Sequence, residues 1–172
     1  MKIKVGKNNI VLIGLMGSGK STIGKRLSEM LGMPFTDVDE YIERHYGTIK
    51  SLFEKGESHF RNIESLAIEA LSKKSGIIIS TGGGVVLRQS NMDALKSNGV
   101  VFYLERPIEE IIRTIAPAGR PLLKNGTQAL YAINRIREPL YLKYGDYRIR
   151  TGDIDGTASE IASLWRSTPF RE

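Results

Sequence analysis

Short apolar runs rich in β-branched residues recur along the chain, separated by longer segments of mixed character. Four of them lie at residues 8–12, 35–38, 77–80 and 100–104, and a weaker one lies at residues 147–150. Apolar runs of this length predict buried strands, as in a parallel sheet that is covered on both faces. In the last run polar and apolar residues alternate, which predicts an edge strand or the end of a strand.

Segments long enough to form helices separate these runs, at residues 20–31, 39–45, 49–53, 58–72, 91–97, 108–115, 128–144 and 157–166. Two of the segments carry an apolar stripe at helical spacing, which predicts a face turned to the core. The stripes consist of Leu27, Met30 and Leu31, and of Leu66, Ala67, Ala70 and Leu71. The alternation predicts an α/β fold, a three-layer α/β/α sandwich around a five-stranded parallel sheet.

The length of 172 residues fits one domain, which we expect to span residues 1–172. The apolar runs are too short to cross a bilayer. The first seven residues are basic, but the apolar stretch after them breaks at Gly14 and leads into a loop of catalytic character. Cleavage of a signal peptide there would destroy that loop, so we expect a cytoplasmic protein that does not bind membranes. Residues 116–126 contain prolines and glycines without periodicity, which predicts a mobile loop that acts as a lid.

The composition limits the metals and the binding partners that we expect for this protein. The chain has no cysteine and only two histidines, so any metal would be a hard cation held by oxygen ligands. The net charge is +6, and Lys and Arg outnumber Asp and Glu between residues 106 and 150. These cations are dispersed among apolar residues without a nucleic-acid-binding motif, which favours phosphorylated or carboxylated small molecules over nucleic acid as partners. A solvated basic face would explain several of them equally well.

One contiguous motif carries the clearest chemistry. The stretch from Gly14 to Ser21 satisfies G-x-x-x-x-G-K-[ST] and lies between a predicted strand and a predicted helix, where a phosphate-binding P-loop belongs. Its backbone N–H groups and the helix N-terminus favour phosphate, the lysine supplies a full charge, and the serine hydroxyl is the expected magnesium ligand. The residues that we expect to contact ATP are Gly17, Ser18, Gly19, Lys20, Ser21 and Thr22.

A P-loop alone does not separate a kinase from a switch or a motor, because all of them hold nucleotides in this way. A kinase also needs a pocket for the phosphoryl acceptor, and three segments could supply one. Asp37 and Asp39 end the second predicted strand, Arg61 lies within a helix, and residues 82–84 are three consecutive glycines after the third strand. Each segment alone is weak evidence, since such an aspartate often caps a helix and such an arginine is often solvated.

Taken together and in this order, the segments resemble the shikimate kinase family from Ile10 to about Arg150. The matching stretches are GLMGSGKST from Gly14, DVD from Asp37, the pattern from Gly56-Glu57 through Phe60-Arg61 to Glu64, STGGG from Ser80, RPLL from Arg120 and REPLY from Arg137. The resemblance implies a P-loop kinase fold with a mobile lid. It also implies an enzyme that uses ATP and Mg²⁺ to phosphorylate the 3-hydroxyl of shikimate, on the route to chorismate and aromatic amino acids.

For the acceptor, the resemblance implies that Arg61 and Arg137 clamp the shikimate carboxylate, which suits the fork of a guanidinium group. It implies that Asp39 accepts hydrogen bonds from ring hydroxyls and acts as the base or orienting group for the attacking oxygen. Gly83 would offer its backbone amide to the substrate.

For the nucleotide, the resemblance implies that Asp37 holds magnesium through water, beside Ser21. Lys20 and Arg120 would act with Asp39 as catalytic residues. Arg120, on the predicted lid, would close over the β- and γ-phosphates of ATP and stabilise charge there. The adenine side carries no stretch that matches residue by residue. We expect ATP and shikimate as partners of a monomeric protein.

Two other functions stay open at this point. A gluconate-type or other small-molecule P-loop kinase could use the same scaffold, since a fold does not fix the acceptor. A nucleotide-binding regulatory or nucleic-acid-associated module would explain the P-loop and the positive charge, and it would show no acceptor-dependent turnover of ATP.

Overall fold

The computed structural model describes residues 6–115 and 126–169. In this part of the chain a five-stranded sheet is formed, with the strand order β2-β3-β1-β4-β5 and parallel pairing throughout. The strands are β1 (Asn9–Ile13), β2 (Phe35–Asp37), β3 (Ile78–Ser80), β4 (Gly99–Glu105) and β5 (Tyr147–Arg150). All five predicted strands are therefore confirmed, including the edge position of the last one.

Eight helices in the described residues connect and flank the strands, and all of them had been predicted. They are α1 (Lys20–Leu31), α2 (Val38–Tyr46), α3 (Ile49–Glu54), α4 (Glu57–Ser72), α5 (Gln89–Asn98), α6 (Ile108–Ile115), α7 (Thr127–Tyr144) and α8 (Ile154–Ser167). A short 3-10 turn, η1 (Val85–Leu87), follows β3 and had not been predicted.

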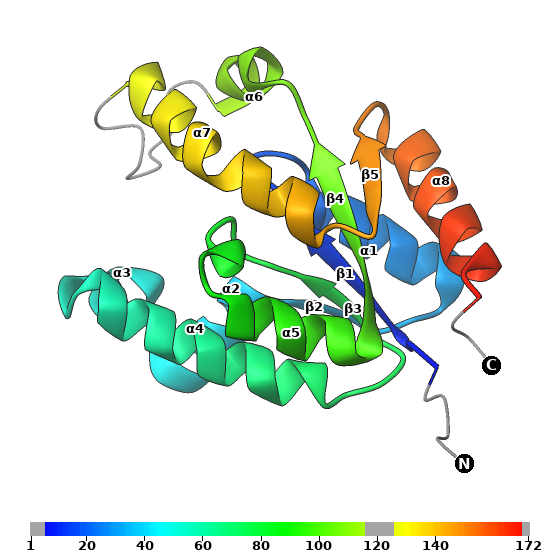
Figure 1. Ribbon diagram of the computed structural model, residues 1–172, viewed down its shortest axis with the longest axis horizontal. Coiled ribbons are helices and arrows are strands. Elements are labelled where there is room, and N and C mark those ends of the chain that lie inside the picture. Colours follow the sequence, from blue (N-terminus) through cyan, green and yellow to red (C-terminus); the bar gives the residue numbers. More distant parts are fainter. Residues whose placement is uncertain (1–5, 116–125, 170–172) are drawn as a thin grey trace.

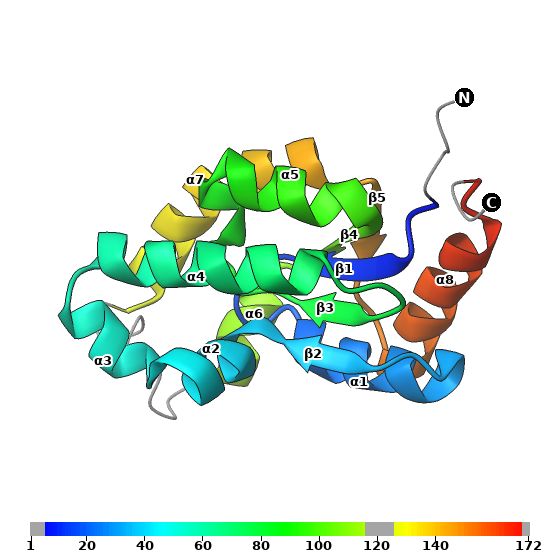
Figure 2. The same ribbon diagram turned by 90° about the horizontal axis from the view of Figure 1, so that it is seen from below.

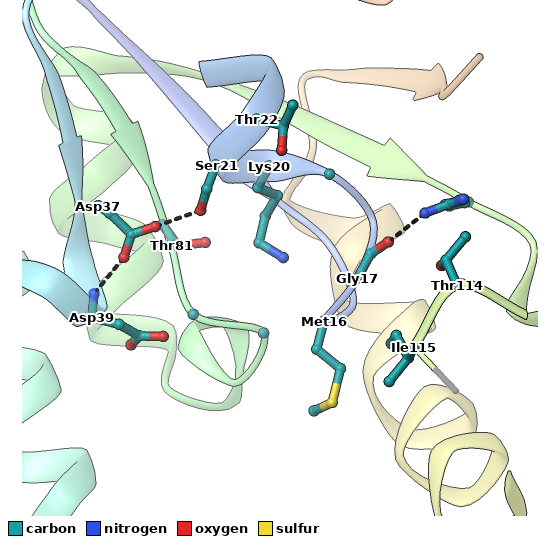
Figure 3. Close-up of a pocket in the computed structure, with 14 residues that line it drawn as sticks. Met16, Gly17, Lys20, Ser21, Thr22, Asp37, Asp39, Thr81, Thr114 and Ile115 are labelled. Atoms are coloured by element: carbon teal, nitrogen blue, oxygen red, sulfur yellow. Dashed lines mark hydrogen bonds between the residues drawn. The ribbon is translucent and has the colours of Figure 1, made fainter. Parts of the chain in front are cut away.

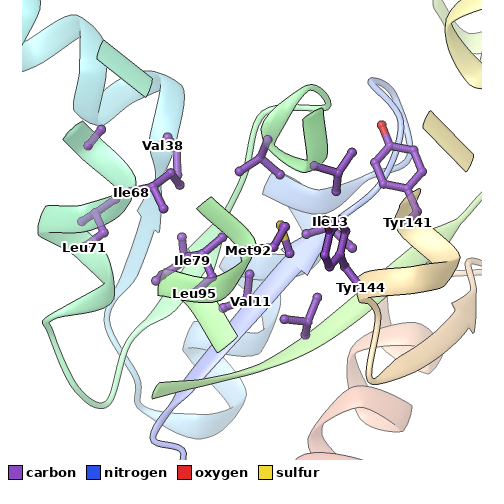
Figure 4. Close-up of a cluster of buried hydrophobic side chains, with 14 of the residues drawn as sticks. Val11, Ile13, Val38, Ile68, Leu71, Ile79, Met92, Leu95, Tyr141 and Tyr144 are labelled. Atoms are coloured by element: carbon purple, nitrogen blue, oxygen red, sulfur yellow. The ribbon is translucent and has the colours of Figure 1, made fainter. Parts of the chain in front are cut away.

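The sheet separates two hydrophobic clusters, and β1 contributes to both. Ile10 and Leu12 belong to the cluster under α1 and α8, whereas Val11 and Ile13 belong to the cluster on the opposite face. Successive side chains of a strand point to opposite faces, so a strand that is apolar throughout must be covered on both. Helices α4, α5 and α7 cover the second face (Figures 1 and 2), and Figure 4 shows the side chains packed there. The predicted α/β/α sandwich is confirmed.

Two details of the prediction were wrong. The second strand ends at Asp37 instead of Val38, because the Asp37 carboxylate accepts hydrogen bonds from the N–H groups of Asp39 and Glu40 and begins α2 there. In α4, Leu66 is 50% exposed and does not face the core. The buried face of α4 points away from Leu66. It includes the charged residues Arg61 and Glu64 together with Phe60, Ala67, Ile68 and Leu71.

Residues 116–125, which hold nearly all of the predicted lid, lie outside the described residues, and so does Arg120. None of the helices in residues 6–115 and 126–169 combines the length and the apolar character needed to cross a bilayer.

Candidate active site

A cavity of about 570 Å³ opens where the strands of the parallel sheet end. The carboxyl ends of parallel strands share one edge, and ligands of open α/β sheets bind in the crevice outside that edge. The lining residues follow four strands. They are Met16, Gly17, Gly19, Lys20, Ser21 and Thr22 after β1, Asp37 and Asp39 after β2, Thr81, Gly82 and Gly83 after β3, and Arg106, Thr114 and Ile115 after β4.

The loop from β1 to α1 has the backbone of a phosphate cradle. Gly17 and Gly19 have φ values of 79° and 95°, a region that side chains with a Cβ rarely adopt. Gly19 lies at the N-terminus of α1, where backbone N–H groups and the helix dipole favour an anion. The Lys20 side chain is buried, and its Nζ donates to the carbonyl oxygens of Gly14 at 2.8 Å and Leu15 at 3.0 Å. The ammonium group is thus held over the loop (Figure 3).

A hydrogen-bonded chain links this loop to α2. The Ser21 hydroxyl donates to Asp37 Oδ2 at 2.5 Å and lies 3.3 Å from the Ser80 hydroxyl. The other carboxylate oxygen, Asp37 Oδ1, accepts from the backbone N–H of Asp39 at 2.9 Å. Figure 3 shows both bonds from Asp37 at one wall of the cavity. Asp37 is therefore both a helix cap and the oxygen neighbour of Ser21.

The carboxyl group of Asp39 has an environment that raises its pKa. The surrounding protein displaces water from its carboxylate, and this desolvation, together with repulsion by Asp37 and Glu64, raises the pKa of Asp39 to about 6. Attraction by Lys20 opposes the rise. The side chain remains accessible from the cavity, so the carboxylate combines contact with solvent and partial desolvation. Such a group changes charge close to neutral pH, which suits a proton acceptor.

The three glycines after β3 are surrounded by charged side chains from separate helices. A Cβ added to Gly82 would lie 3.3 Å from both Asp39 Oδ1 and Glu64 Oε2. A Cβ on Gly84 would overlap the Arg61 guanidinium group. A side chain at Gly84 would displace the buried Arg61 guanidinium group, and one at Gly82 would press on the two carboxylates, because the backbone and the charged groups lie so close together. Asp39 of α2 and the two charged residues of α4, Arg61 and Glu64, therefore all lie against this turn.

Arg61 and Glu64 form an ion pair inside the protein. Arg61 Nη1 donates to Glu64 Oε1 at 2.8 Å, and the two residues are only 8% and 1% exposed. A second contact, from Arg61 Nη2 to Glu57 Oε1 at 3.6 Å, involves an exposed partner. Burial raises the pKa of Glu64, while Arg61 opposes the rise. Arg61 is thus not a solvated surface arginine, the alternative that the sequence had left open.

From the other side of the turn, α7 presents Arg137 and Tyr141. A Cβ on Gly83 would lie 3.2 Å from Arg137 Nη1, and the Tyr141 hydroxyl donates to the Gly83 carbonyl oxygen at 2.6 Å. Arg61 and Arg137 are not among the described residues that line the large cavity. They lie next to the glycines of its wall, Arg61 against Gly84 and Arg137 against Gly83.

Arg106 is a member of the site that sequence reasoning missed. It follows β4, lines the cavity, and donates from Nη1 to the carbonyl oxygen of Gly17 at 3.0 Å. Its Nε lies 3.7 Å from Glu110 Oε2, a weak and partly exposed contact. The P-loop motif gives no signal for a cation that comes from a distant strand end. Only a reading of every charged residue at the end of a predicted strand would have singled it out.

Most predicted site residues meet in one region. The predicted residues Gly17, Gly19, Lys20, Ser21, Thr22, Asp37, Asp39 and Gly83 line the cavity. Ser18 is buried within the loop, with its hydroxyl oxygen 3.5 Å from Lys20 Nζ. The phosphate cradle therefore lies next to the carboxylate of Asp39 and the guanidinium groups of Arg61 and Arg137, at the edge of a parallel sheet with the strand order β2-β3-β1-β4-β5. This fold and this site define the protein as a P-loop kinase.

Comparison with known proteins identifies the family of P-loop kinases to which the chain belongs. The family model described as shikimate kinase matches residues 16–164. A shikimate kinase of Clostridium botulinum is 42% identical over 160 residues, which cover 92% of this chain and 97% of the relative. The chain belongs to the shikimate kinase family, and it is an ATP-dependent kinase.

Solved structures agree with this assignment. The shikimate kinase from Acinetobacter baumannii in complex with shikimate has a TM-score of 0.87 and 38% identity, with 93% of each chain covered. The superposition on a gluconokinase from Sinorhizobium meliloti also covers 93% of each chain, but with a TM-score of 0.62 and 17% identity. At that level of identity the likeness shows a shared fold alone.

Proposed function

We propose that this protein transfers the γ-phosphoryl group of ATP to the 3-hydroxyl of shikimate, giving shikimate 3-phosphate and ADP. The observation that carries the proposal is the convergence of Asp39, Arg61 and Arg137 on the three glycines, beside the cradle that holds Lys20. A carboxylated ring with several hydroxyls offers the complementary groups, an anion for guanidinium and alcohols for a carboxylate.

At the nucleotide end, the amides of the P-loop and Lys20 would bind the phosphates. Lys20 would exchange its contacts with the loop carbonyls for the β- and γ-phosphates, and Thr22 would face the α-phosphate side. Binding of this kind positions ATP and offsets its negative charge, which is most of what a kinase must do.

The site also fits Mg²⁺. Ser21 Oγ and Asp37 Oδ2 lie 2.5 Å apart at the wall of the cavity, and both are oxygen donors of the kind that Mg²⁺ prefers. Mg²⁺ takes few protein ligands and completes its coordination with water and phosphate oxygens. In our proposal Ser21 and Asp37 would hold it, Asp37 through water, and the ion would neutralise charge on the phosphates.

At the acceptor end, Arg137 and Arg61 would hold the shikimate carboxylate. Arg61 keeps its buried pair with Glu64 in this proposal, and the substrate replaces only the long contact of Nη2 with the exposed Glu57. A guanidinium group has five N–H donors, so it can serve both carboxylates. The Gly83 backbone amide would give a further hydrogen bond to the substrate.

Asp39 would act on the attacking hydroxyl. Above its pKa of about 6 the carboxylate is ionised and can accept the proton of the 3-hydroxyl while the oxygen attacks the γ-phosphorus and ADP leaves. Arg120 remains a prediction, since it lies outside the described residues. We propose that it closes over the phosphates and helps to exclude water, which would otherwise hydrolyse ATP.

A coupled assay of ADP release tests the proposal. ATP and Mg²⁺ are supplied with shikimate, with gluconate, with a nucleoside monophosphate, or without acceptor. We expect rapid release of ADP with shikimate and only background release in the other three reactions. Turnover that gluconate stimulates as strongly as shikimate, or that needs no acceptor at all, would contradict the proposal.

A further inference from the structure

Tyr141 lies where α7 meets the glycine turn. It follows Arg137 by four residues, so both side chains project from the same face of α7. The Tyr141 residue is fully buried, and its ring stacks on Tyr103 with 5.2 Å between the centroids. Figure 4 shows the ring at the end of the core cluster. The aromatic part of Tyr141 therefore belongs to the core.

Its hydroxyl has a different environment. It donates to the Gly83 carbonyl oxygen at 2.6 Å, a short bond for an O–H donor. A Cβ on Gly83 would lie 3.5 Å from this hydroxyl and 3.2 Å from Arg137 Nη1. Burial raises the pKa of Tyr141 to about 12, and the nearby Arg137 opposes that rise. The hydroxyl and the guanidinium group thus meet the same residue of the cavity wall.

Backbone hydrogen bonds fix the two ends of the glycine turn, from the Val85 N–H to the Gly82 carbonyl oxygen at 3.2 Å and from the Leu87 N–H to the Gly84 carbonyl oxygen at 3.1 Å. The Tyr141 bond holds the residue between them. Residues 82–84 have no side chains of their own to fix the backbone, and glycine is the residue with the widest choice of conformations. The Tyr141 bond attaches the middle residue of the turn to a rigid helix through a buried ring. Since Gly83 lines the cavity, this bond connects α7 to a wall of the site.

We propose that Tyr141 is a positioning residue for the acceptor: its hydroxyl holds the Gly83 backbone in register with the Arg137 guanidinium group, so that both meet the substrate together. The proposal rests on the proposed function, in which Gly83 and Arg137 bind shikimate. It extends that function to a residue that would not touch the substrate itself. A purely structural Tyr141 would stabilise the core without favouring one substrate over the other.

The test removes one oxygen atom. Tyr141→Phe keeps the ring and its stack on Tyr103, and Tyr103→Phe is the matched control because it removes a hydroxyl from the other ring of the same stack. For Tyr141→Phe we expect the KM for shikimate to rise about fivefold to tenfold, the usual scale for one lost hydrogen bond, with the KM for ATP within about twofold of the unmodified enzyme. Tyr103→Phe should leave both KM values within that range.

Gly83→Ala is a second variant that leaves the core intact. Its methyl group would lie 3.2 Å from Arg137 Nη1 and press on the guanidinium group, so this variant should also raise the KM for shikimate selectively. The inference is overturned if Tyr141→Phe leaves the shikimate KM unchanged, if both substrates are affected equally, or if Tyr103→Phe has the same effect. An unmodified enzyme that does not use shikimate would overturn the proposed function itself, and the two failures are therefore distinguishable.

Discussion

The phosphate-binding loop takes its shape from one continuous stretch of chain, whereas the acceptor end is assembled from segments that are far apart in the sequence. In the loop, Gly17 and Gly19 adopt left-handed backbone angles and place Lys20 at the start of α1. At the acceptor end, side chains from α2, α4 and α7 meet over the turn that follows β3. Local geometry thus builds the first end and tertiary packing builds the second.

The difference has consequences for stability and for substitution. The loop borders α6, since a Cβ on Gly17 would lie 2.6 Å from Ile115, but its function depends mainly on backbone amides and one lysine. The acceptor end contains the buried Arg61 and Glu64, whose charges are costly to leave unpaired. Substitution of Lys20 should therefore affect catalysis with little effect on folding. Substitutions at the acceptor end should affect both.

The largest effect is expected from Lys20→Met. Loss of the ammonium group removes a charge from the phosphates, and we expect kcat to fall about a thousandfold, the upper range for one electrostatic contact. The control is Lys25→Met, an exposed lysine on the same helix, which should retain activity. Measurement of kcat with saturating shikimate checks the prediction. Equal activity of the two variants would contradict the assignment of this loop as the binding site for the phosphates of ATP.

Glu64→Ala probes the buried pair. It leaves the Arg61 guanidinium buried without its 2.8 Å partner, so we expect a loss of about 3 kcal/mol in the free energy of unfolding. Glu69→Ala is the control, because Glu69 lies on the same helix and pairs with Lys73 at the same distance on the surface. It should have no measurable effect. Chemical denaturation checks both variants, and equal losses would remove the contrast between the two ends.

Asp39→Asn separates chemistry from nucleotide binding. We expect kcat to fall about a hundredfold while the KM for ATP stays nearly unchanged, since the carboxylate would act on the acceptor alone. For the unmodified enzyme, kcat/KM for shikimate should fall as the pH is lowered through about 6, where Asp39 becomes protonated. Glu40→Gln, at an exposed neighbouring position, should keep full activity and the same pH profile.

The same pKa makes a prediction about stability. A carboxyl group has a pKa of about 4 when exposed, and the folded protein raises that of Asp39 to about 6. The native state therefore binds the proton more tightly than the unfolded chain, and this group's contribution to stability is lost as the pH rises from about 4 to about 6. Asp39→Asn should melt at a higher temperature than the unmodified protein at pH 7. A lower melting temperature would mean that the ionised carboxylate stabilises the fold.

The smallest effect is expected from Arg106→Gln. This change removes a partly exposed charge next to Gly17, so we expect the KM for ATP to rise about fivefold and the KM for shikimate to stay constant. Arg166→Gln, on the exposed side of α8, is the control. A rise in the KM for shikimate would place Arg106 at the acceptor end and would blur the distinction between the two regions.

The contrast also explains what the sequence could predict. The strands, the helices and the P-loop follow from local patterns, so their ends could be placed to within about three residues. Leu66 was assigned to the core from spacing alone, but the packing of α4 turns Glu64 inward in its place, because Arg61 compensates the buried charge. Arg106 and Tyr141 contact residues that are distant in the sequence. No local pattern encodes such contacts, and the grouping of the acceptor residues was available only through the resemblance to a family.

In the proposed function Asp39 selects one ring hydroxyl of shikimate while the guanidinium groups of Arg61 and Arg137 hold the carboxylate. The most direct test is NMR spectroscopy of the product formed from ATP and shikimate, in which coupling between phosphorus and a ring proton identifies the phosphorylated carbon. We predict coupling to the proton on carbon 3 alone. Coupling at another ring carbon, or a mixture of positions, would contradict this arrangement of the acceptor.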